Sequence, residues 1–380
     1  MFRSARSATG ALAVVGLAAG VLALQAPVSA GTPAFRLQLL HASDLEGGVA
    51  AIDRAPNFAA IVDALEYAPG MGASITLSAG DNYIPGPFFS AAGDPSVVPA
   101  LAAANGLAST LASAGRADAS IMNVVGFDAS ALGNHEFDLG SREVRNIIAA
   151  TTSAGVTWPG VQFPYLSGNL NFAGDADLNS LFQAPPSILA SSAYRTGGAA
   201  GTRKIAPYTV IEEGGERIGV VGATTPILQT ISSPTGTTVI GPNTNDMPAL
   251  AAVLQPRIDE LIATGVNKVV LVSHLQQISL EQTLAPLLTG VDAPTTDQQD
   301  AQERRETDHG DALDALAQPQ PLIAVLDVHV FDADGVAVGV AQVGDQFAQL
   351  RLRRHPGDGI GGEFAIEVGF AQPVGRRVEL

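Results

Sequence analysis

The chain has 380 residues, 46% of them hydrophobic, and a formal net charge of −17 at pH 7. It contains no cysteine, which excludes a disulfide scaffold and a thiolate metal site. The acidic balance repels nucleic-acid backbones, so we expect no nucleic-acid partner, although bound metal ions could still attract a phosphate group.

The first 30 residues have the pattern of a secretory signal peptide. Two arginines precede an apolar run from Ala11 to Leu24, and small residues stand before a cleavage point after Ala30. An uncleaved membrane anchor is the alternative, but this run of about 14 residues is short of the ~20 that span a bilayer. We therefore expect cleavage, no stable membrane span afterwards, and a product that is secreted, periplasmic or held at the cell surface.

Hydrophobic periodicity predicts a layered α/β fold with a largely parallel sheet, because strands alternate with helices along most of the chain. The last third changes to β, with strands expected over 321–331, 336–343, 349–354 and 364–368. Two segments are expected to be loops or insertions, about 173–203 and about 293–320. The other predicted elements, in chain order, are strand 35–40, helix 56–67, strand 75–77, helix 119–125, strand 129–132, helix 139–150, hairpin 208–222, helix 247–263 and strand 268–272.

Polar residues that can bind metal follow four of the predicted strands, and ligands of α/β sheets bind at such carboxyl ends. Each residue alone is more often structural, since an Asp in this position is commonly a helix cap. Together they offer the oxygen and imidazole ligands that suit a hard or borderline divalent ion. A carboxylate can also bridge two ions about 3.5–4 Å apart, as in two-metal hydrolytic sites. The residues are Asp44 and Glu46, Asp81, Asn134 and His135, and His274.

These motifs resemble those of the calcineurin-like metallophosphoesterase superfamily, in its 5′-nucleotidase branch. That family is marked by D-x-H, G-D-x-x-x-G, G-N-H-E-F-D and a later strand that ends in S-H. This chain has Asp44-Leu45-Glu46, Gly80 to Gly86 with one extra residue, Gly133 to Asp138, and Ser273-His274. The resemblance covers roughly residues 35–292, returns faintly near 321–354, and is most specific at G-N-H-E-F-D.

The resemblance implies a four-layer α/β/β/α sandwich over residues 31–355, interrupted by the polar insertion at about 293–320 and followed by a short tail over 356–380. The nucleobase-stacking domain of larger family members is not expected, because few residues follow Arg354.

Carried over by position, the resemblance also implies two divalent metal ions, which could be Mn, Mg, Ca or Zn. Asp44 would bind the first ion, Asp81 would bridge both, and Asn134 and His274 would bind the second. His135 would contact the phosphoryl oxygen or the leaving group, and Asp138 would orient His135 as a carboxylate fixes an imidazole tautomer. The metals would lower the pKa of bound water so that hydroxide attacks phosphorus.

The chain departs from the family pattern at two places. Glu46 stands where the family has the His of D-x-H; it is either a ligand that favours a harder ion than Zn or simply part of a Gly-rich loop. The expected later strand ending in G-H-x-H is not found after Asp292. The segments around His309 and His329 could substitute, but a structural role is the favoured interpretation of each.

The site residues are compatible with three functions. The first is a secreted, metal-dependent phosphohydrolase that acts on a small phosphorylated substrate such as a nucleotide, in the manner of a 5′-nucleotidase. The second is a non-catalytic or weakly active binding or surface protein on a decayed phosphoesterase fold. The third is a cyclic-nucleotide phosphodiesterase that uses the same site. The non-ligand pair His135 and Asp138 favours an enzyme, because a chain that had lost catalysis has little physical reason to keep it.

Overall fold

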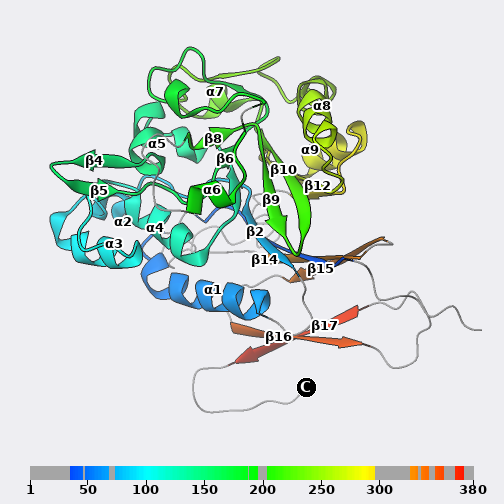
Figure 1. Ribbon diagram of the computed structural model, residues 1–380, viewed down its shortest axis with the longest axis horizontal. Coiled ribbons are helices and arrows are strands. Elements are labelled where there is room, and N and C mark those ends of the chain that lie inside the picture. The colour runs from blue at the N-terminus through cyan, green and yellow to red at the C-terminus, as the bar shows by residue number, and fades with distance from the viewer. Residues whose placement is uncertain are drawn as a thin grey trace, which may run out of the picture. The chain divides into compact units, whose positions relative to one another are not determined.

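The computed structural model describes residues 35–45, 48–67, 73–186, 188–195 and 203–295, and four strands between residues 326 and 371 (Figure 1). Residues 1–30, Glu46 and most of the predicted polar insertion lie outside these ranges. The helices are α1 (Ala51–Glu66), α2 (Pro87–Ala91), α3 (Val98–Ala104), α4 (Arg116–Val125), α5 (Ser141–Ile148), α6 (Ser192–Arg195), α7 (Leu228–Ile231), α8 (Met247–Ala263) and α9 (Ile278–Leu284). Within the described ranges, none of them is both long and apolar enough to cross a lipid bilayer.

Two main sheets form the centre of the fold. The larger has the strand order β15-β14-β1-β2-β3-β6-β8, and the smaller has the order β13-β12-β10-β9. The strands of the first are β1 (Leu37–Ala42), β2 (Ser74–Ser78), β3 (Ala129–Ala131), β6 (Tyr165–Leu166), β8 (Ile205–Ala206), β14 (Leu326–Asp332) and β15 (Gly335–Ala341). Those of the second are β9 (Tyr208–Glu213), β10 (Glu216–Thr224), β12 (Val269–His274) and β13 (Ala293–Thr295).

Smaller pairs of strands complete the described β-structure: β4 (Thr151–Ser153) with β5 (Val156–Trp158), β7 (Leu170–Asn171) with β11 (Thr238–Val239), and β16 (Phe347–Arg354) with β17 (Phe364–Ala371). Single turns of 3₁₀-helix occur at Pro95–Val97, His135–Phe137, Asn179–Leu181 and Ala285–Leu287. β17 lies in the segment that was expected to be a tail.

The sheets are largely parallel, as the alternation of elements predicted. β1, β2, β3, β6 and β8 run parallel to one another, whereas β14 and β15 extend that sheet in antiparallel fashion. In the smaller sheet β10, β12 and β13 are parallel, and β9 forms the predicted antiparallel hairpin with β10. The hairpin turns through Gly214 and Gly215, whose φ angles of 58° and 81° suit a residue without Cβ.

The order of layers is helices, sheet, sheet, helices, which is the predicted four-layer sandwich. Alternate residues of each strand enter different cores: Leu39 of β1 faces the smaller sheet, and Leu40 faces the helical layer of α1, α4 and α5. In β12, Val270 packs between the sheets and Leu271 packs against the α8 side. Figure 1 shows α8 and α9 beside β10 and β12, on the side away from β2. Because both faces of β1 and β12 are covered, each of these strands is buried throughout.

The largest differences from the predicted elements concern short segments. α2 and α3 fill residues that carry no clear periodicity, and each begins with a proline at its first or second position, where a missing N–H costs nothing. α1 begins at Ala51 and contains Pro56, whereas the sequence predicted a start at Pro56. β13 lies at the start of the predicted polar insertion. Its three residues include Pro294, and a proline argues against a strand when only the sequence is known.

Asp118 of α4 gives the fold a pH dependence that can be measured. Asp118 is buried and lines a small cavity together with residues that include Phe58 and Met122, and burial raises its pKa to about 7. In the unfolded chain the Asp118 carboxyl ionises near pH 3.9. Between about pH 4 and pH 7 the folded chain therefore keeps a proton on Asp118 that the unfolded chain has lost. Stability should therefore fall as pH rises through this window.

We expect Asp118→Asn to remove the part of this fall that Asp118 causes, because asparagine does not ionise. As pH rises from 4 to 7, the free energy of unfolding of the variant should increase relative to that of the native chain, at a rate on the order of 1 kcal/mol per pH unit. Urea denaturation at pH 4, 5, 6 and 7 measures both. Parallel pH profiles for the two proteins would show that Asp118 ionises normally in the folded state.

Candidate metal centre and active site

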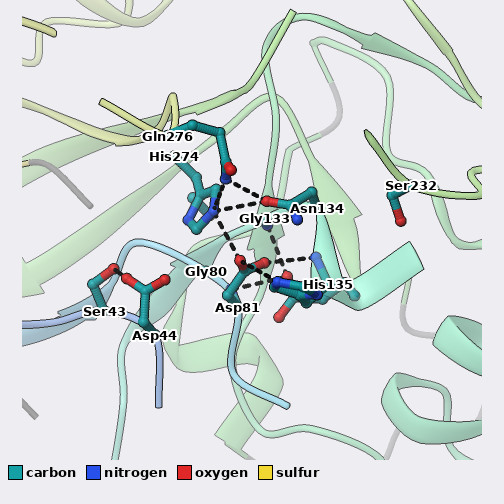
Figure 2. A network of polar contacts seen from close by, with 12 residues as sticks. Ser43, Asp44, Gly80, Asp81, Gly133, Asn134, His135, Ser232, His274 and Gln276 are labelled. Atoms are coloured by element: carbon teal, nitrogen blue, oxygen red, sulfur yellow. Dashed lines mark hydrogen bonds and ion pairs between the residues drawn. The ribbon is translucent and has the colours of Figure 1, made fainter. Parts of the chain in front are cut away.

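The loops after β1, β2 and β3 meet at the carboxyl end of β12 (Figure 2). These three loops carry Asp44, Asp81 and Asn134, and His274 is the last residue of β12 itself. One ligand atom each of Asp44, Asp81 and His274 lies within 4.8 Å of the other two. This clustering follows from the parallel strands, whose carboxyl ends share one edge of each sheet.

Asp81 lies at the centre of the cluster and is fully buried. Its Oδ2 is 2.9 Å from His274 Nε2 and 4.0 Å from His135 Nε2, and its Oδ1 accepts a hydrogen bond of 2.7 Å from the His135 backbone N–H. Burial by itself would raise the pKa of Asp81, but the two histidines outweigh it and hold that pKa below its ordinary value. A buried, ionised carboxylate of this kind attracts a cation.

The backbone of the loops is strained where the acidic residues stand. Asp44 and Asp81 have φ angles of 52° and 51°, in the left-handed region that few residues other than glycine adopt. The β2 and β3 loops also approach each other closely, since a Cβ on Gly133 would stand 2.1 Å from Asp81 Oδ1. A Cβ on Gly80 would likewise stand 2.5 Å from the Gly133 nitrogen. Only glycine at these positions lets both loops reach one point.

Glu136 fixes the two loops to each other, a role that the sequence did not predict. Its buried carboxyl accepts backbone N–H bonds from Asp81 at 3.0 Å, Asn82 at 2.8 Å and Gly133 at 2.8 Å. Burial and the neighbouring charge of Asp81 raise the pKa of Glu136 to about 8. The position of Glu136 within G-N-H-E-F-D was the one available sequence signal.

Asn134 and His274 stand next to each other on the side of Asp81 that faces the smaller sheet. Asn134 Oδ1 is 3.1 Å from His274 Nε2, and both side chains are buried. Gln276, which the sequence did not single out, contacts both of them through its amide group. Carboxylate, amide and imidazole groups therefore converge here, and this set could hold a divalent metal.

His135 differs from the buried cluster because a quarter of its side chain is exposed. Its Nδ1 lies 2.6 Å from Asp138 Oδ2. The second Asp138 oxygen, Oδ1, accepts a bond of 3.0 Å from the Ser232 hydroxyl. The other ring nitrogen, Nε2, lies on the side of the ring that faces Asp81, 4.0 Å from Asp81 Oδ2. Ser232 was missed because it lies 94 residues from Asp138 in the chain.

Several predicted site segments are not brought into the described cluster. Glu46 and the segment around His309 lie outside the described residues. His329 lies in β14, paired with Leu39 of β1, three positions before that strand ends. β13 runs parallel to β12 with Thr295 opposite Val272, and the chain after Thr295 again lies outside the described ranges. A strand therefore does begin where the sequence indicated only a polar insertion.

Comparison with known proteins gives matches over nearly half of the chain, although no family model matches it. It is 28% identical over 183 residues to the trifunctional nucleotide phosphoesterase protein YfkN of Bacillus subtilis, over 47% of this chain and 12% of that protein. It is 31% identical over 174 residues to the 5′-nucleotidase of Rattus norvegicus, over 46% of this chain and 24% of that protein. Over this stretch the chain is similar in sequence to 5′-nucleotidases.

This relationship confirms the resemblance that the motifs indicated. The chain spans at most about a quarter of the length of these two relatives. Among solved structures, a 5′-nucleotidase precursor from Thermus thermophilus aligns at 22% identity with a TM-score of 0.48, over 82% of this chain and 54% of that one.

Proposed function

We propose that this chain is a metal-dependent phosphohydrolase that removes phosphate from small phosphomonoesters, nucleotides among them, at a dinuclear metal site. One observation carries the proposal: the clustering of Asp44, Asp81 and His274 beside the pair His135 and Asp138. The sequence relationship to 5′-nucleotidases supports the same reaction class. A site built only for binding has no need of a partly exposed imidazole held by a carboxylate.

The residues present fit divalent ions. The buried Asp81 carboxylate belongs to one cluster with Asp44 and His274 and lies 2.9 Å from His274 Nε2, which supports its role as the proposed bridge between two ions. We assign Asp44 to the first ion, with Glu46 as a further candidate from outside the described residues. Asn134 and His274 are assigned to the second ion. Such ions, when bound, lower the pKa of water and offset the charge of a transferring phosphoryl group.

We assign His135 to the substrate rather than to the metal. Asp138 holds Nδ1 and stabilises the protonated imidazole, so Nε2–H can donate to a phosphoryl oxygen or give its proton to the leaving oxygen. The exposed quarter of the ring provides access for the ester.

Ser232 should support this pair by holding Asp138. Ser232→Ala removes the bond to Asp138 Oδ1, and a bond worth about 1 kcal/mol corresponds to a roughly fivefold lower rate of phosphate release. The bound metal should not change. Steady-state rates compared with Ser233→Ala, an exposed neighbour, measure the effect. Equal rates in the two variants would mean that Asp138 needs no support from Ser232.

The proposal is tested with protein stripped of metal and reconstituted with Mn, Mg, Ca or Zn in turn. Phosphate release is measured from AMP and an aryl phosphate, and hydrolysis from a cyclic nucleotide. Metal-dependent turnover of both monoesters, with little of the cyclic diester, is expected. Preferred turnover of the cyclic diester would favour a phosphodiesterase. Folded protein that binds metal and hydrolyses none of the three would be a non-catalytic binding protein.

Export belongs to the proposal as well and depends on residues 1–30. N-terminal sequencing of the product from its native cells should begin at Gly31. A product that keeps residues 1–30 would contradict signal cleavage.

A further inference from the structure

Gln276 follows His274 by two residues, directly after the end of β12. Its φ angle of 76° is in the left-handed region, which is unfavourable for a residue other than glycine. Figure 2 shows its amide beside His274 and Asn134. Strained residues of this kind persist where the surrounding structure holds them, which is most often at functional sites.

The polar atoms around His274 Nε2 have the spacing of ligands on a single ion. Asp81 Oδ2 is 2.9 Å away, Asn134 Oδ1 3.1 Å, and the Gln276 amide 2.8 Å. Ligand atoms about 2.1 Å from one ion, at right angles, lie about 3.0 Å from each other. The Gln276 amide also contacts the Asn134 oxygen directly. The Gln276 amide therefore contacts two of the side chains assigned to the second ion, Asn134 and His274.

The Gln276 amide can present oxygen at this point. Its nitrogen faces His274 and Asn134 here, and a half-turn of the amide exchanges nitrogen and oxygen without moving the rest of the side chain. A cation between these groups favours that exchange, since an amide oxygen binds metal whereas an amide N–H does not.

We propose that the side-chain oxygen of Gln276 is a ligand of the second metal ion, together with Asp81, Asn134 and His274. This rests on the proposed function, because it presumes the dinuclear site. The three other groups leave at least one position of a four-coordinate ion for a further ligand. Gln276 supplies that ligand in a chain whose sequence shows no G-H-x-H motif.

The proposed ligand set has a consequence for metal choice. Three oxygens and one imidazole nitrogen are harder than a set with a second imidazole, so Mn²⁺ should be preferred to Zn²⁺ at the second position relative to a Gln276→His variant.

The test measures metal binding and not turnover. Metal-free native chain, Gln276→Ala, Gln276→Glu and the control Gln277→Ala are dialysed against graded Mn²⁺, and bound Mn²⁺ is measured by elemental analysis. Gln277 is the adjacent, exposed residue of the same type. We expect the second ion to bind at least tenfold more weakly to Gln276→Ala, and as tightly as to the native chain, or more tightly, in Gln276→Glu. Gln277→Ala should match the native chain.

Two results would overturn this assignment. One is a Gln276→Ala variant that binds Mn²⁺ as the native chain does; the other is a Gln276→Glu variant that loses the ion as the alanine variant does. Circular dichroism of the metal-free proteins confirms that all four are folded. A native chain that binds Mn²⁺ in the expected way but releases no phosphate would reject the proposed function and leave the role of Gln276 intact.

Discussion

Replacing His135 with alanine is expected to lower the rate of phosphate release from AMP by ~10²–10⁴-fold, which is the usual contribution of a general acid. The variant should keep its metal, because the described ligand cluster does not need the imidazole: Asp81, Asn134 and His274 stay in place. The measurement is the steady-state rate on reconstituted protein, with bound metal determined on the same sample.

The choice of substrate separates proton donation from a structural effect. An aryl phosphate has a good leaving group that needs little protonation, so His135→Ala should slow its hydrolysis less than that of AMP. A variant that loses activity on both substrates equally, and also loses its metal, would show that His135 maintains the cluster instead of acting on the ester.

Asp81→Asn is expected to abolish turnover almost completely, on the order of 10³-fold or more, because Asp81 is the carboxylate that we propose as the bridge between both ions. Asparagine has the same shape but lacks the charge, so both ions should bind more weakly. The native chain should unfold at a higher temperature when Mn²⁺ is added, and the variant should show little such shift.

The control for Asp81→Asn is Asp53→Asn, which makes the same change of charge at an exposed position of α1. It should keep native turnover and the native thermal shift with Mn²⁺. If Asp81→Asn kept the native metal affinity, Asp81 could not be the bridge between two ions, and the dinuclear assignment would be wrong.

The sequence predicted those parts of the fold that depend on local periodicity. Leu39 and Leu40 show the principle, because alternate residues of an extended strand enter opposite cores whatever their neighbours are. The cluster of Asp44, Asp81, Asn134 and His274 was predictable for a related reason. Each residue follows a strand of an α/β fold, and such strand ends share one edge.

The supporting contacts could not be predicted, because each joins residues that are distant in the chain. Glu136 holds the β2 loop 55 residues away, and Ser232 reaches Asp138 across 94 residues. Gln276 had no motif to mark it, and its role depends on a backbone turn that adjacent residues do not signal. Short elements such as β13 were missed because three residues show no period.

A two-metal phosphohydrolase needs both of its ions, so phosphate release from AMP should be followed while Mn²⁺ is returned to the stripped chain and bound metal is counted. We expect a low rate with the first equivalent and a steep rise as the second binds. Full activity with a single bound ion, or none after both have bound, would contradict the two-metal proposal.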